Sequence, residues 1–125
     1  MGRTVLIVDD SEMIRNFHSY IIKTLGLEII TAIDGADALE KVYGGNHELV
    51  GCITDINMPN MDGYTLIERL REDPQYEDMP IIIISTEDEF KDRERGFEAG
   101  ANVYIVKPTD PDLLLENIRM LLGKP

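Results

Sequence analysis

Carboxylates stand where two apolar runs of strand length end, and they are the residues of this sequence best suited to chemistry. The run at residues 49–53 leads into Asp55, and the run at residues 4–8 leads into Asp9 and Asp10. Open α/β sheets place ligand chemistry at the carboxyl ends of buried strands. We therefore expect Asp55 to be the residue around which a functional site is organised.

Two more apolar runs end in polar side chains that complement these carboxylates. Residues 81–84 end at Ser85, and residues 103–106 end at Lys107. Crowded carboxylates repel one another unless a cation neutralises them, and Mg²⁺ is the default hard ion for oxygen ligands. With a metal on one flank, and an ammonium and a hydroxyl on the other, the site suits a transferred phosphoryl group. Asp55 is the candidate nucleophile, which would form an aspartyl-phosphate.

Each of these residues, taken singly, has an ordinary structural explanation. An acidic pair such as Asp9 and Asp10 often serves only as a turn and a helix cap. Asp55 is followed by a loop that contains proline and glycine, and Lys107 stands before a proline where a strand ends. It is their joint placement at the ends of four strands that favours a functional site.

The side chains meet only if the strands that carry them are parallel, and the segments between the strands determine whether they can be. Helical patterns separate the apolar runs, and the segment at residues 87–99 is so highly charged that we expect a weakly anchored, exposed helix there. Such alternation predicts an α/β fold with a doubly wound, five-stranded parallel sheet of the flavodoxin-like (βα)5 type, because parallel crossovers need helices. In the strand order 2-1-3-4-5, the first and third strands flank the crevice where ligands bind.

Length and charge limit the class of protein. The 125 residues suffice for one domain, and we assign residues 1–125 to a single domain without a linker. A net charge of −12 excludes general binding to nucleic acid or to anionic membranes, both of which need basic surfaces. No apolar stretch approaches the ~20 residues of a membrane span. Cys52 is the only cysteine, so a reducing, cytoplasmic location fits best.

Four short motifs carry a resemblance to a known family. They read Val-Asp9-Asp10-Ser, Asp55-Ile-Asn57-Met-Pro59 with Asp62-Gly63, Ile-Ser85-Thr, and Gly100-Ala-Asn-Val-Tyr104-Ile-Val-Lys107-Pro108. With these motifs at these spacings, the sequence resembles the receiver domain of bacterial two-component response regulators. The resemblance extends over the whole chain, and the combination is highly specific.

The resemblance implies a role for each matching residue. Asp55 is implied as the phosphoacceptor, Ser85 as a switch hydroxyl and Lys107 as the partner of the phosphate. The implied arrangement of Mg²⁺ uses Asp9 through water, Asp10, Asp55 and the backbone carbonyl of Asn57. A cis peptide bond before Pro108 is also implied, although only about one X-Pro bond in twenty is cis in folded proteins.

The resemblance also implies a mechanism and partners. Asp55 would attack the phosphorus of a phosphohistidine that a sensor histidine kinase presents. The new charge would draw Ser85 inward, and Tyr104 would swing into the vacated space. The surface made by the fourth helix, fifth strand and fifth helix would then change shape for a downstream protein, as a population shift. We expect a monomer and leave dimerisation on activation open.

Three residues are implied to set the lifetime of the phosphoryl group. Asn57 and Glu87 lie two residues past Asp55 and Ser85. This pairing resembles chemotaxis regulators of the CheY type and implies fairly rapid loss of phosphate. Thr86 adds bulk where alanine is common, which would slow an attacking water molecule. We expect a moderate rate.

Two alternatives to a signalling switch are a phosphorelay intermediate and a phosphatase. A phosphorelay intermediate, which passes its phosphoryl group to a histidine phosphotransfer protein, would have the same fold and site. A phosphatase of the haloacid dehalogenase type needs a second catalytic aspartate two residues after the nucleophile, where this sequence has Asn57. We expect a protein that promotes only its own phosphorylation and dephosphorylation. His18 and His47 have no evident partner for catalysis or metal binding.

Overall fold

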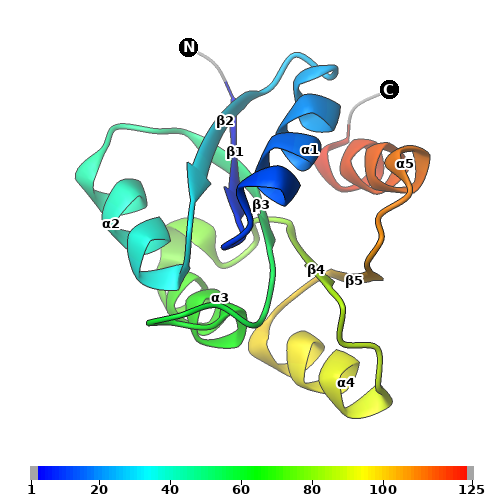
Figure 1. The fold of residues 1–125 in the computed structure, drawn as a ribbon. Coiled ribbons are helices and arrows are strands. Elements are labelled where there is room, and N and C mark those ends of the chain that lie inside the picture. Colours follow the sequence, from blue (N-terminus) through cyan, green and yellow to red (C-terminus); the bar gives the residue numbers. More distant parts are fainter. Residues whose placement is uncertain (1–2, 124–125) are drawn as a thin grey trace.

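Five parallel strands form the centre of the molecule (Figure 1). The computed structural model describes residues 3–123, so residues 1, 2, 124 and 125 of the predicted single domain lie outside the described part. The strands are β1 (Thr4–Val8), β2 (Glu28–Ala32), β3 (Leu49–Thr54), β4 (Ile81–Ser85) and β5 (Val103–Val106). Their order is β2-β1-β3-β4-β5, which confirms the predicted doubly wound α/β fold.

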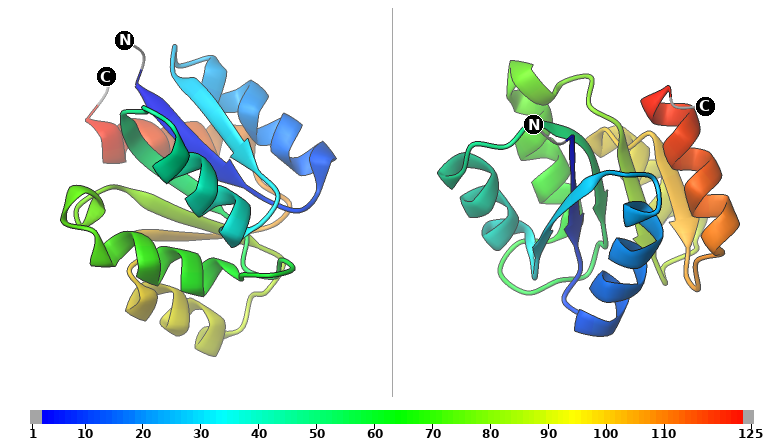
Figure 2. Two further views of the ribbon diagram at one scale, coloured as in Figure 1. Left: turned by 90° about the vertical axis from the view of Figure 1, so that its left-hand side faces the viewer. Right: turned by 90° about the horizontal axis from the view of Figure 1, so that it is seen from above.

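Helices cover both faces of the sheet, as Figure 2 shows. On one face lie α1 (Glu12–Lys23) and α5 (Pro111–Leu122), and on the other lie α2 (Gly35–Gly44), α3 (Gly63–Glu72) and α4 (Phe90–Ala99). A short 3₁₀ turn (Pro74–Tyr76) follows α3. None of the helices in residues 3–123 is long and apolar enough to cross a membrane.

The central strands are continuous apolar runs because both of their faces are covered. Every residue of β1 and of β4 is buried. Successive side chains point to opposite faces: Leu6 and Ile83 belong to the core under α2, α3 and α4, whereas Ile7 and Ile82 belong to the core under α1 and α5. Two cores therefore hold the strands whose carboxyl ends carry the predicted site.

Side-chain caps set where the helices begin. Ser11 Oγ accepts from the backbone N–H of Ile14 at 3.3 Å, so α1 starts directly after the Asp9-Asp10 pair. Asp34, Asp62 and Asp110 cap α2, α3 and α5 in the same way. These caps satisfy N–H groups that have no partner within the helix. They hold the loops at one edge of the sheet short and ordered.

The helix predicted at residues 87–99 begins later, at Phe90. Its first predicted residue, Glu87, is held outside the helix because its backbone N–H donates to Ser85 Oγ and its carbonyl accepts from Tyr104. Glu89 and Asp92 then form a reciprocal capping box. The predicted start of this helix was therefore wrong by three residues, because side chains from β4 and β5 form hydrogen bonds with the Glu87 backbone.

Candidate functional site

Three carboxylates meet at the carboxyl end of the sheet. One oxygen from each of Asp9, Asp10 and Asp55 lies within 4.8 Å of the others. The backbone N–H of Asp55 donates to Val8 O at 2.9 Å, which places the ends of β1 and β3 side by side. Asp9 is 2% exposed and Asp55 is 9% exposed, whereas Asp10 is open to solvent. The structure thus brings together the three acidic residues that the sequence singled out.

Lys107 supplies the positive charge next to this cluster. Its Nζ donates to Asp9 Oδ2 at 2.9 Å and to Asp55 Oδ2 at 3.0 Å. Burial disfavours the ammonium, but the hydrogen bonds to Asp9 and Asp55 outweigh it and raise the pKa of Lys107. One ammonium therefore serves two buried carboxylates, and the cluster keeps an excess of negative charge. The peptide bond from Lys107 to Pro108 is cis, the isomer that the resemblance implies.

Asp55 is oriented by its own loop as well as by Lys107. Its Oδ1 accepts from the backbone N–H of Ile56 at 2.7 Å, and Ile56 O in turn accepts from Gly63 N at 2.9 Å. A side chain at Gly63 would overlap the carbonyl oxygen of Asp55, so this close turn requires glycine. Burial raises the pKa of Asp55, and the hydrogen bonds from Lys107 and Ile56 offset this only in part.

The donor set fits a hard divalent cation. Carboxylate oxygens that lie this close gain most from an ion with oxygen ligands, and the exposed Asp10 leaves one side open for the waters that Mg²⁺ retains. Asp9 Oδ1 already accepts from Ser11 N at 2.9 Å, which fixes its carboxylate in the cluster. The residues that could hold the ion are Asp9, Asp10 and Asp55. The backbone carbonyl of Asn57, in the loop after Asp55, stays a predicted ligand.

Ser85 and Tyr104 meet at a single backbone segment. Ser85 is fully buried, and its Oγ accepts from Glu87 N at 3.1 Å. The half-buried Tyr104 donates from its hydroxyl to Glu87 O at 2.7 Å, and its ring lies beside Gly96 of α4. Among the hydrogen bonds of residues 3–123, none joins the Ser85 side chain to Asp55. The switch that we expect for these two residues stays a prediction, and in this structure Tyr104 lies against α4.

A small apolar pocket adjoins the site, and the sequence did not predict it. It has a volume of about 300 Å³ and lies between α1 and the segment after β5. Its lining includes Phe17, His18 and Thr86 as well as the site residue Lys107. Thr86 is exposed to solvent. The predicted lifetime residue is therefore adjacent to the predicted phosphate partner.

His18 is buried and has a hydrogen-bond partner that the sequence did not predict. It is 2% exposed, and its Nε2 lies 3.3 Å from Thr109 Oγ1. Burial lowers the pKa of His18 to about 4, although Asp9 opposes this. The spacing of His18 from Ile14 and Ile21 placed it on the apolar face of α1, which was the available signal for burial. Thr109 lies 91 residues away and could not be paired with it from the sequence.

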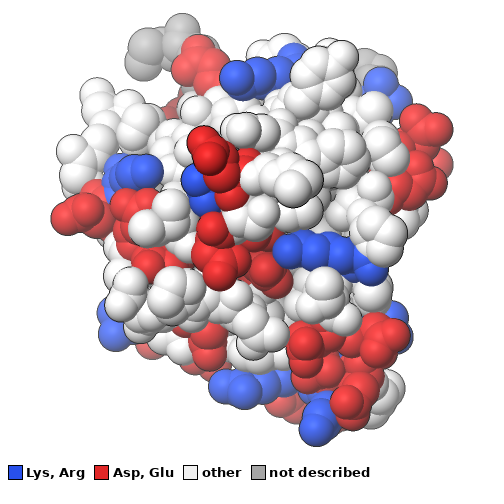
Figure 3. All heavy atoms as spheres, in the orientation of Figure 1, with Lys and Arg blue, Asp and Glu red and all other residues white. Residues whose placement is uncertain are grey.

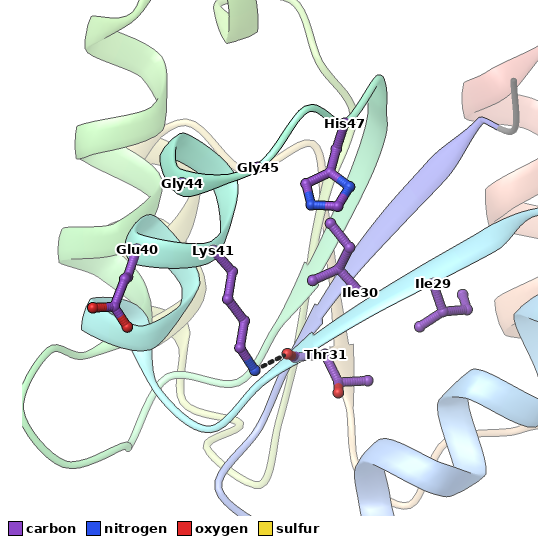
Figure 4. Close-up of a pocket in the computed structure, with 8 residues that line it drawn as sticks. All are labelled: Ile29, Ile30, Thr31, Glu40, Lys41, Gly44, Gly45 and His47. Carbon is purple, nitrogen blue, oxygen red and sulfur yellow. Dashed lines mark hydrogen bonds between the residues drawn. The ribbon is translucent and has the colours of Figure 1, made fainter.

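A larger groove lies between α2 and β2, the strand at one side of the sheet (Figure 4). It has a volume of about 590 Å³. Lys41 crosses it and donates to Thr31 O at 2.8 Å, which covers part of the free edge of β2. None of its lining residues belongs to the acidic cluster. This groove is thus separate from the candidate site.

The fold and this site define a class of protein. A parallel sheet in the order β2-β1-β3-β4-β5 carries an acidic cluster and a lysine at one edge. Residues 5–119 match the family described as the response regulator receiver domain. The chain belongs to this family, which confirms the resemblance seen in the motifs.

Individual relatives agree with this assignment. The chain is 38% identical over 120 residues to chemotaxis protein CheY1 of Helicobacter pylori, which covers 95% of this chain and 96% of that protein. The solved structure of chemotaxis protein CheY4 of Vibrio cholerae superposes with a TM-score of 0.87 at 34% identity, and covers 97% of this chain and 99% of that one. A gliding motility regulatory protein of Myxococcus xanthus is 39% identical over 103 residues, but this chain spans only 13% of its length.

Proposed function

We propose that this chain is a phosphorylation-activated switch of a two-component system and that Asp55 is its phosphoacceptor. The observation that carries the proposal is the placement of Asp55. It lies in an acidic cluster that fits Mg²⁺, with Lys107 Nζ 3.0 Å from Oδ2. The Asp55 side chain is buried, which helps to hold its carboxylate in one orientation. The acidic cluster is nevertheless open to solvent at Asp10, so a phosphodonor can reach it.

The chemistry of transfer needs little beyond positioning and charge. An oxygen of Asp55 forms a bond to phosphorus while the bond from phosphorus to the imidazole nitrogen of the donor breaks. Asp9, Asp10 and Asp55 would hold Mg²⁺, which would neutralise charge on the phosphoryl oxygens. Lys107 loses one carboxylate partner in this step and is free to donate to a phosphoryl oxygen instead. The free imidazole leaves with the donor protein.

A sensor histidine kinase is the proposed donor, and α1 offers a surface to receive it. Met13, Phe17 and Tyr20 are exposed on this helix. Figure 3 shows a broad area without charged side chains over α1 and toward α5. Exposed apolar area of this kind marks interaction sites. Because Phe17 also lines the pocket beside Lys107, this surface reaches the phosphorylation site.

The proposed output surface is the face made by α4, β5 and α5. Tyr104 of β5 touches both the loop after Ser85 and helix α4, so a change near Ser85 reaches α4 through it. The relatives from Helicobacter pylori and Vibrio cholerae are named as chemotaxis proteins, which supports a downstream target in motility control. They give no support to the phosphorelay or phosphatase alternatives. In our proposal the chain turns over no substrate besides its own phosphoryl group.

Phosphorylation is tested with a small-molecule phosphodonor and Mg²⁺, followed by mass spectrometry of the intact protein. We expect one phosphoryl group per chain in the wild type and none in Asp55→Asn. The matched control is Asp62→Asn, because asparagine caps α3 as well as aspartate does and the change lies in the same loop. Labelling of Asp55→Asn, or continuous turnover of the donor without a stable protein adduct, contradicts the proposal.

The switch is tested separately by NMR with beryllofluoride, which mimics a phosphoryl group on a carboxylate. We expect Mg²⁺-dependent shifts at Asp55 together with shifts at Tyr104 and in α4. Shifts confined to the neighbourhood of Asp55 would retain the phosphoacceptor and refute the switch.

A further inference from the structure

A buried carboxylate outside the acidic cluster joins two loops of the site. Asp34 caps α2 and is only 2% exposed. Its Oδ1 accepts from Asp37 N at 2.8 Å, which is the cap itself. Its Oδ2 accepts from Asn60 Nδ2 at 2.8 Å, and Asn60 belongs to the loop that follows Asp55. One side chain therefore begins a helix and also holds a loop 26 residues away.

The backbone at the tip of this loop is shaped for the contact. Asn60 has a φ of 65°, the left-handed conformation that residues other than glycine rarely adopt. Next to it, Met61 O accepts from Gly35 N at 3.1 Å. A Cβ at Gly35 would lie 2.7 Å from Met61 Cγ, so the start of α2 and the loop tip are in close contact. Two hydrogen bonds and close packing thus fasten the tip to α2.

The same segment also contacts the other acidic strand end. Ala32 O, two residues before Asp34, accepts from Asp9 N at 3.1 Å. The connection from β2 to α2 therefore touches the loop after β1 on one side and the loop after β3 on the other. Asn57 belongs to this second loop. It lies between the base of the loop, where Gly63 N donates to Ile56 O, and the tip that is attached to α2.

We propose that Asp34 and Asn60 are positioning residues for the metal site: their hydrogen bond holds the loop at residues 56–63 and thereby sets the position of the Asn57 backbone relative to the three carboxylates. This inference rests on the proposed function and on the Mg²⁺ arrangement that the family resemblance implies, which includes the Asn57 carbonyl. Partners behind a metal ligand commonly change affinity ten- to a hundredfold when removed, because they keep the ligand in place.

A purely structural reading would make Asp34 a helix cap and Asn60 a turn residue with no effect on the metal. Asn60→Gly separates the two readings, because glycine accepts the same φ and leaves the Asp34 cap bond intact. Asp34→Asn is the complementary change. Asparagine still caps the helix, but it turns an amide donor toward the amide donor of Asn60. The double change Asp34→Asn with Asn60→Asp restores a donor facing an acceptor at unchanged net charge.

The measurement is a Mg²⁺ titration of the wild type, the two single variants, the double variant and a control, read by NMR shifts of the amides in residues 56–61. Amide hydrogen exchange of the same residues is recorded without metal. We expect Asn60→Gly and Asp34→Asn each to weaken Mg²⁺ binding about tenfold and to speed exchange in the loop, and the double change to return both to within about twofold of the wild type. Asp110→Asn, the same substitution in the cap of α5, serves as the control and should change neither quantity.

Wild-type Mg²⁺ affinity in Asn60→Gly, or a double variant as weak as Asp34→Asn, would overturn the inference while phosphorylation of wild-type Asp55 stands. If the wild type binds no Mg²⁺ and accepts no phosphoryl group, the proposed function fails and the inference fails with it. The phosphodonor experiment on the wild type distinguishes these two failures.

Discussion

Lys107 Nζ donates to Asp55 Oδ2 at 3.0 Å, so the proposed phosphoacceptor is paired with a cation before any ion or phosphoryl group arrives. The same ammonium bonds Asp9. Lys107 therefore offsets charge that a divalent cation would otherwise neutralise.

Lys107→Met should strengthen Mg²⁺ binding about tenfold, because a unit charge removed from beside the ion is worth more than 1 kcal/mol at the effective dielectric of a protein. Calorimetric titration at low salt measures the change. The control is Lys41→Met, which removes a lysine paired with Asp37 away from the cluster. Unchanged or weaker binding in Lys107→Met would show that this lysine does not compete with the ion.

His18 should make the stability of the protein depend on pH. Burial lowers its pKa from 6.5 to about 4 in the folded protein, with Asp9 opposing this change and Lys107 adding to it. Between these values the unfolded chain binds a proton that the folded chain does not. As far as His18 is concerned, the free energy of unfolding is therefore highest above pH 6.5, and it decreases as the pH falls toward 4.

The lowered pKa of His18 corresponds to a decrease of about 3 kcal/mol in the free energy of unfolding between pH 6.5 and 4. Urea denaturation of the wild type and of His18→Gln at several pH values tests this, and the curve of the variant should be flatter by that amount. His47 is exposed, so His47→Gln should leave the plot of unfolding free energy against pH unchanged. Parallel curves for His18→Gln and the wild type would contradict the lowered pKa.

Gly96→Ala should destabilise the protein even though alanine favours helices. A Cβ there would lie 2.7 Å from Ile83 Cδ1 and 3.3 Å from Tyr104 Cδ2. Overpacking commonly costs about 1–3 kcal/mol, which exceeds the ~1 kcal/mol gained in helix propensity. We expect a net loss of about 1 kcal/mol in denaturation experiments, with NMR shifts of the Tyr104 ring.

Gly44→Ala provides the contrast, because a Cβ at Gly44 meets nothing within 4 Å. This variant should be as stable as the wild type or more so. If Gly96→Ala also gains stability and the Tyr104 ring does not shift, α4 is free to move away from β5.

Thr86→Ala should shorten the lifetime of the phosphoryl group on Asp55. Thr86 is exposed and lines the pocket that Lys107 also lines, so its side chain should narrow one approach to the site. We expect loss of phosphate to accelerate about threefold, equivalent to about 0.6 kcal/mol of barrier. The decay of labelled protein in Mg²⁺ measures it, and Thr24→Ala at the end of α1 is the remote control. A wild-type adduct that lasts many hours would contradict the moderate rate that we expect.

Phe17→Ser should impair phosphorylation by a kinase without affecting phosphorylation by a small donor. Phe17 is exposed on α1 and lines the pocket beside Lys107. An apolar contact of this size commonly contributes about 1–3 kcal/mol, so transfer from the cognate kinase should fall about tenfold or more. Phe90→Ser removes a ring from α4 that is more exposed than Phe17, and it should leave transfer unchanged. Equal losses with both donors would place the effect in the site itself.

The strand positions and the acidic cluster could be predicted from the sequence for a physical reason. Strands covered on both faces must be apolar throughout, so β1 and β4 stand out as continuous runs. Parallel strands present their carboxyl ends at one edge, which brings Asp9, Asp55 and Lys107 together without knowledge of any side-chain conformation. Local pattern and topology were enough for this part of the site.

Tertiary structure decided the contacts between residues far apart in the chain. The sequence by itself determined the fold, the family and the cluster of Asp9, Asp10 and Asp55. It did not show that His18 meets Thr109, or that Asp34 holds Asn60. A hydrogen bond depends on distances of a few tenths of an ångström. Such distances follow from how helices pack on the sheet and not from the spacing of residues along the chain.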